Sequence, residues 1–176
     1  MIALLSNPGD VAWFACLGFP LAAADQRDAG AYLAALDYPD GTAVVGVRTW
    51  REAEAVIRDA DWDQSWWTRE EREREHLMAQ VRTRLGEAAL LERLTAATEL
   101  ASDAIHGAAA IAAERDGVAD AALVRAASGA ATMALHAAAL ARLAGEGPEH
   151  LFMRKYALFE SGRWPLGVVG GRFFLF

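Results

Sequence analysis

The sequence predicts a mainly α-helical protein with a small N-terminal α/β part, followed by an antiparallel helical bundle and a C-terminal strand or hairpin. Alanine, the strongest helix former, supplies 40 of the 176 residues. The first 60 residues alternate short apolar runs with helical patterns, which is typical of a short parallel sheet of βαβαβα order. From residue 68 to residue 161, every segment has a helical pattern, interrupted only by short glycine-containing breaks.

Turn and capping residues define the elements of the first 60 residues. Asn7-Pro8-Gly9 and Pro39-Asp40-Gly41 are turn sequences, and each adjoins a predicted strand. Thr49 and Glu52 form a capping box that predicts the start of a helix. In order, we expect a strand over 2–5, a helix over 10–17, a short strand over 20–24, a helix over 28–36, a strand over 42–47 and a helix to about residue 60.

The helical bundle follows a tryptophan-rich connector. A second capping box, Thr68 with Glu71, predicts the start of the first bundle helix. Breaks near Gly86, at Asp116-Gly117, at 145–148 and at Gly162 divide the region into three or four antiparallel helices. The predicted organisation is an α/β subdomain over 1–60, a connector over 61–67, a helical bundle over 68–161 and an apolar tail over 162–176 that packs on the body.

The tail ends in four bulky apolar residues, 173–176, after the glycine pair at 170–171. Alternation along a strand cannot place four consecutive side chains on one face. We therefore expect the end of the chain to be covered on both sides, by the bundle and by a neighbouring strand or another subunit.

Charge and cysteine content exclude several classes of function. The chain has 17 basic and 24 acidic residues, a net charge of -7, and a surface of this sign repels phosphate backbones, so we expect no nucleic-acid binding. Cys16 is the only cysteine, which rules out an intrachain disulfide and a cysteine metal cluster. The sequence shows no signal-peptide pattern and no charge-free apolar stretch of 18 residues, and predicts a cytoplasmic protein without membrane contact.

Residues 2–19 resemble, without gaps, the opening strand and helix of the F subunit of rotary V-type and archaeal-type ATPases. Phe14 and Gly18 match a Phe and a Gly of that family, although the residues flanking Phe14 differ from its pattern. The predicted strand over 42–47 also falls where the family has one. The resemblance covers residues 1–60 and implies a non-enzymatic α/β domain that docks on a partner.

Two helical spacings match those of a di-iron site. Glu73-x-x-His76 and Asp103-x-x-His106 each place a carboxylate and an imidazole at positions i and i+3. Helical phase turns His76 away from the apolar face that follows Leu77, and it places His106 among acidic residues. We therefore predict no metal site and no cofactor.

Two sets of residues are candidates for a binding site. His136 lies on an apolar helical face with Thr132 and Met133, which indicates either a core histidine or a ligand pocket between helices. Tryptophans gather around the connector, where they either seal the joint between sheet and bundle or anchor a partner. The candidate partner contacts are Trp62, Trp66, Trp67, Arg163 and Trp164.

No Walker loop, dinucleotide fingerprint or nucleophile elbow occurs in the sequence. The leading hypothesis is a non-catalytic binding or accessory protein, adaptor-like or immunity-like, that contacts a protein partner or self-associates. The alternative is a small-ligand-binding protein or enzyme with its pocket near His136.

Overall fold

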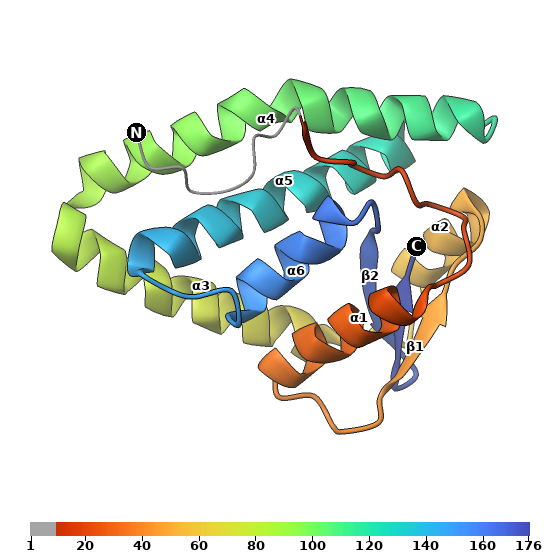
Figure 1. Ribbon diagram of the computed structural model, residues 1–176, viewed down its shortest axis with the longest axis horizontal. Helices are drawn as coiled ribbons and strands as arrows, with labels where there is room; N and C mark the ends of the chain where they lie inside the picture. Colours follow the sequence, from red (N-terminus) through yellow and green to blue (C-terminus); the bar gives the residue numbers. More distant parts are fainter. Residues whose placement is uncertain (1–9) are drawn as a thin grey trace.

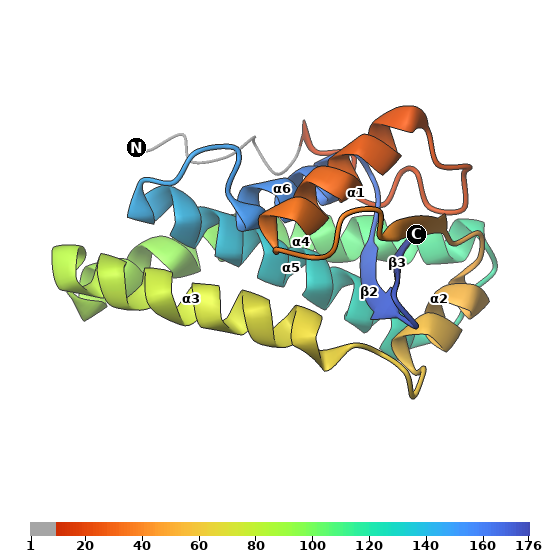
Figure 2. The ribbon, with the colours of Figure 1, turned by 90° about the horizontal axis from the view of Figure 1, so that it is seen from below.

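The computed structural model describes residues 10–176 and places them in six helices and three strands (Figures 1 and 2). The prediction of a mainly helical chain with a small sheet is confirmed. The elements are α1 (Ala23–Ala35), β1 (Ala43–Gly46), α2 (Trp50–Ile57), α3 (Gln64–Leu85), α4 (Glu87–Arg115), α5 (Ala121–Ala144), α6 (Leu151–Glu160), β2 (Pro165–Val169) and β3 (Arg172–Leu175).

Helix α5 is the centre of the bundle. It lies between α4 and α6 in Figure 1, and α3 packs along it as well. Many of its buried residues are alanines, whose small side chains let neighbouring helices approach closely. By length and composition α5 would also be able to cross a membrane, but 56% of its most apolar window is buried in the fold, as in a core helix.

The start of α3 differs from the prediction, because Asp63 and not Thr68 caps this helix. The Asp63 carboxylate accepts a hydrogen bond from the Ser65 backbone N–H at 2.8 Å. Thr68 lies inside α3, where its hydroxyl donates to the Gln64 carbonyl. Helix α3 therefore includes Trp66 and Trp67 of the predicted connector. The cap at Thr49, by contrast, starts α2 as predicted.

The sheet has the order β1-β3-β2, with β1 parallel and β2 antiparallel to β3. The C-terminal tail forms the β2–β3 hairpin, whose turn uses Gly170 and Gly171 at φ of 54° and 72°. Such positive values favour glycine. Thus β3 is the central strand and the sheet is mixed, whereas a parallel βαβαβα sheet was expected from the first 60 residues.

Two expected N-terminal elements are absent from the described residues, and a third lies outside them. Residues 12–18 form turns instead of a helix, and residues 20–24 form a loop and the start of α1 instead of a strand. The strand predicted over 2–5 lies outside the described residues. Of the three strands predicted in the first 60 residues, the structure therefore shows β1.

Contacts with the distant segment 162–163 and a left-handed residue at Phe14 explain why residues 12–18 do not form a helix: the Cys16 backbone N–H donates to the Gly162 carbonyl at 3.1 Å, and Phe14 has φ of 58°. In a helix the Cys16 N–H would donate to the Ala12 carbonyl, so its bond to Gly162 takes the place of a helical hydrogen bond. The buried Arg163 guanidinium donates to the carbonyls of Cys16, Phe19 and Pro20 and pairs with Asp25 at 2.8 Å, which holds this segment against the body of the protein. The apolar spacing that predicted a helix is overridden by this tertiary contact.

Tyr156 of α6 is buried in the protein core. Its side chain is 1% exposed, and its hydroxyl has no hydrogen-bond partner among the described residues. Burial, together with the nearby Glu160, raises the pKa of Tyr156 well above its ordinary value. The native state therefore holds this phenol neutral.

We expect Tyr156→Phe to stabilise the protein by about 1 kcal/mol, because the substitution removes an unsatisfied buried hydroxyl. A raised native pKa also means that the unfolded state ionises first, so stability falls as pH rises above the ordinary tyrosine value of 10.0. The part of the alkaline loss of stability that comes from Tyr156 should be absent in the variant. Urea unfolding at pH 8 and in the alkaline range measures both effects, and a destabilised variant would contradict the prediction.

Candidate functional site

A buried polar network joins α1, α3 and α6. The Trp66 indole N–H donates to the Tyr32 hydroxyl at 2.8 Å, and this hydroxyl donates to Glu70 Oε1 at 2.6 Å. Lys155, the only lysine of the chain, donates to Glu70 Oε2 at 2.7 Å and lies over the Trp66 ring. Burial, and then the charge of Glu70, raise the pKa of Tyr32. The polar groups of this network are paired with one another, so the network connects the three helices.

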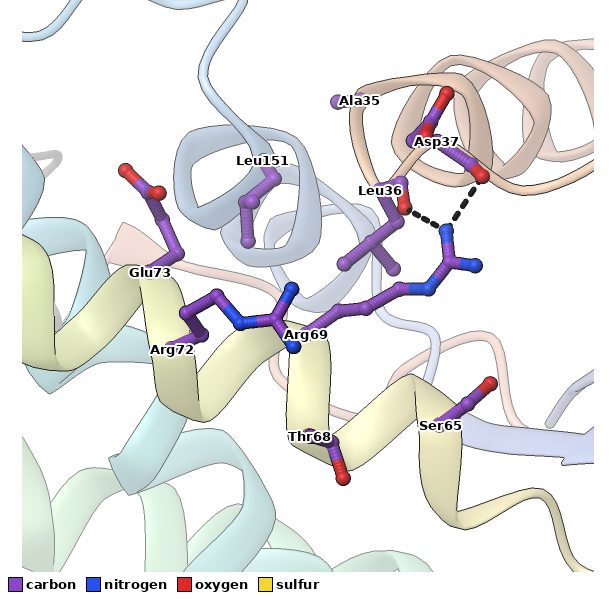
Figure 3. Close-up of a pocket in the computed structure, with 9 residues that line it drawn as sticks. All are labelled: Ala35, Leu36, Asp37, Ser65, Thr68, Arg69, Arg72, Glu73 and Leu151. Atoms are coloured by element: carbon purple, nitrogen blue, oxygen red, sulfur yellow. Dashed lines mark hydrogen bonds between the residues drawn. The ribbon is translucent and has the colours of Figure 1, made fainter.

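A groove of about 530 Å³ lies between the end of α1, α3 and the start of α6 (Figure 3). Figure 3 shows Arg69 reaching the end of α1, where its guanidinium donates to the carbonyls of Leu36 and Asp37. The charges of Arg69 and Arg72 are balanced by those of Asp37 and Glu73. The groove therefore has no net charge with which to select an ionic ligand.

His150 fixes one wall of this groove, and sequence reasoning overlooked it. Its Nδ1 accepts the Phe152 backbone N–H at 3.2 Å and caps α6, while its Nε2 lies 3.1 Å from Glu73 Oε1. The ring is therefore the Nε2–H tautomer that donates to Glu73. Histidine is not among the preferred capping residues, so no local signal indicated this role.

A second hollow lies on the opposite flank of α3, between α3, α5 and α6, and we call it the Trp67–Met133 hollow. Trp67 is 41% exposed and Met133 is 49% exposed. The volume of this hollow is about 30 Å³, which is too small for a drug-sized ligand but large enough for part of an aliphatic side chain. Its lining residues are Trp67, Glu70, Glu71, Arg74, Met133, Ala134, Ala137, Phe152 and Lys155.

Helical phase explains why Trp67 borders this hollow. The buried face of α3 includes Trp66, Glu70 and Leu77, and Trp67 lies about 100° around the helix from Trp66, at the edge of that face. Small Ala134 and Ala137 on α5 leave space beside it. Arg74 pairs with Glu71 on the rim.

The other predicted partner contacts lie within the fold. Trp66, Arg163 and Trp164 are each at most 5% exposed. Trp62 is half-buried, contacts Trp66 edge to face and donates from its indole to the Leu166 carbonyl. These four side chains join the sheet to the helices, which leaves Trp67 as the exposed member of the set.

The predicted pocket residues of α5 do not all meet in one hollow. Met133 lines the Trp67–Met133 hollow, whereas Thr132 and His136 are not among its lining residues. Thr132 donates to the Ser128 carbonyl one turn earlier. Burial, and secondly the charge of Arg74, lower the pKa of His136, which favours the neutral ring.

Within residues 10–176, no group of three or more His, Cys, Asp or Glu residues is arranged to hold a metal ion. His76 is exposed, and Glu73 pairs with His150. His106 is also exposed, with Nδ1 3.5 Å from Ser128 Oγ.

No family model, curated protein or solved structure matches this chain. The resemblance of residues 1–60 to the rotary ATPase F subunit therefore stays a prediction.

Proposed function

We propose that this chain is a non-catalytic, cytoplasmic accessory protein that acts through protein contacts, and that its partner docks on the Trp67–Met133 hollow. One observation carries the proposal. Two large apolar side chains from separate helices, Trp67 at 41% exposure and Met133 at 49%, border the same hollow. An exposed aromatic and an exposed methionine in one place are typical of the centre of a protein interface.

The surroundings of the hollow suit a protein partner of a particular kind. Its base includes Glu70 and Lys155, which neutralise each other, so a docking group meets no unpaired charge there. Glu71 and Arg74 supply a polar rim. The partner surface would present an aliphatic side chain to the hollow and polar groups to the rim.

We expect Trp67→Ala or Met133→Ala to weaken partner binding by a factor of about 10 to 100, as truncation of an interface hot spot does. The measurement is affinity purification of tagged variants from the native host, with the captured proteins quantified by mass spectrometry. Capture of the untagged chain itself would identify a second copy as the partner.

The matched controls are Leu100→Ala and Ile111→Ala on α4, where the side chains are 80% and 69% exposed. Thermal melts should show that all four variants remain folded. A partner lost with the Trp67 and Met133 variants and retained with the α4 variants supports the proposal. Equal recovery with all four, or loss only with the α4 variants, would contradict it.

A further inference from the structure

A cavity of about 520 Å³ lies where three distant parts of the chain meet: the turn at 17–19, the start of α2 and the corner between α4 and α5. Figures 1 and 2 both place α2 beside this corner. We infer that this cavity binds a small organic anion that carries an apolar group. Its lining residues are Leu17, Gly18, Phe19, Arg48, Thr49, Trp50, Arg51, Arg115, Asp116 and Val118.

The charge of the lining opposes that of the whole chain. The lining contains three arginines and one aspartate, so its net charge is +2, whereas the whole chain carries -7. Arg115 forms an ion pair with Asp116, so the excess comes from Arg48 and Arg51. A concentration of positive charge in a concave site attracts anions.

The guanidinium groups of Arg48 and Arg51 supply the donors for an anion. Between residues 10 and 176, neither forms a hydrogen bond or an ion pair through its side chain; the Arg48 contact with Glu52 is made by its backbone N–H. A guanidinium offers paired N–H donors that match a carboxylate or phosphate, and Lys cannot reproduce this geometry.

Four other lining side chains are apolar. Leu17 and Trp50 are buried at the base, and Val118 is half-buried, while Phe19 is 57% exposed. A volume of about 520 Å³ lies in the range of small-molecule sites, which combine apolar walls with a few convergent polar groups. An apolar group in the cavity would cover Phe19 while its anionic end met the arginines.

The base of the cavity is held in place before any ligand arrives. The Trp50 indole N–H donates to Asp116 Oδ2 at 3.2 Å, and Arg115 donates to both Asp116 and the Leu17 carbonyl. Gly18 has φ of 79°, and a Cβ there would lie 3.0 Å from the Arg48 carbonyl oxygen. Glycine thus allows the turn to approach the start of α2. A preformed site loses less conformational entropy on binding.

Octanoate is the probe for this site, and 1-octanol is its uncharged counterpart. We expect octanoate to bind at one saturable site by calorimetry and to shift the Trp50 indole resonance in a proton–nitrogen NMR spectrum. The Trp67 indole, which belongs to the other hollow, should not shift. Added salt should weaken the binding, because the contact is ionic and partly exposed.

The decisive variant is Arg48→Gln with Arg51→Gln, which should weaken octanoate binding about tenfold or more. Its control is Arg84→Gln with Arg93→Gln, two exposed arginines outside the cavity with the same change in charge. Full affinity in the control and loss in the decisive variant support the inference.

Three results would overturn the inference of an anion site. These are absence of octanoate binding, equal octanoate affinity in both double variants, and binding of 1-octanol as tight as that of octanoate. All of these outcomes are independent of the proposed protein contact, because they concern a different surface.

Discussion

Removal of residues 173–176 is expected to abolish cooperative folding. These residues include most of β3, which pairs with both other strands. The side chains of Phe173, Leu175 and Phe176 are each 0% exposed. Phe173 and Leu175 pack with Tyr32 and α1, while Phe176 packs on the other face against Trp50 and Trp164. Both faces of the strand are therefore covered.

Burial of these three side chains contributes on the order of 5 to 9 kcal/mol, comparable to the whole net stability of a domain. The truncated chain should lack a cooperative transition in urea and lose far-UV circular dichroism. The single substitution Phe173→Ala should cost about 3 to 5 kcal/mol, whereas Arg172→Ala, exposed on the same strand, should change stability by less than about 0.5 kcal/mol. A truncated chain that melts within a few degrees of the full chain would contradict this role of β3.

The second large effect is expected at the buried pair of Glu70 and Lys155. Their side chains are 8% and 13% exposed, so Lys155→Met leaves a carboxylate in the core without its counter-charge. Loss of one partner of a buried pair costs about 3 to 5 kcal/mol. Combining Lys155→Met with Glu70→Gln should recover much of the lost stability, because the amide oxygen of Gln still accepts from the Tyr32 hydroxyl.

A double-mutant cycle in urea measures this coupling. The matched control is Arg58→Met at the surface pair with Glu54, where the arginine side chain is 70% exposed and the expected change is below about 1 kcal/mol. Additive effects of the Glu70 and Lys155 substitutions would show that the two charges do not stabilise each other.

Local signals in the sequence predicted much of the helical fold. The breaks near Gly86 and Asp116-Gly117 coincide with helix ends, as does the cap at Thr49. The turn over 12–18 was missed because Gly162 and Arg163, distant in sequence, bind the backbone of Cys16. The central position of β3 was missed because a parallel pairing with β1 spans more than a hundred residues and leaves no local pattern.

The candidate sites were predictable only in part. Trp67 was singled out as one of the clustered tryptophans and Met133 as a helical neighbour of His136. The two stood under separate hypotheses, because the packing of α3 on α5 that brings them together has no sequence signal. The cavity of Arg48 and Arg51 went unnoticed for a similar reason. Its lining comes from three segments up to about a hundred positions apart, and neither arginine stands out by spacing.

Photo-cross-linking in the native host tests the proposed contact most directly. A benzophenone amino acid replaces Trp67 in one variant, Met133 in a second variant and Ile111 on α4 in a third variant. We predict that positions 67 and 133 cross-link to the same partner, while Ile111, although 69% exposed, does not. Cross-linking from position 111 without cross-linking from 67 and 133 would contradict the claim that the Trp67–Met133 hollow is the docking surface.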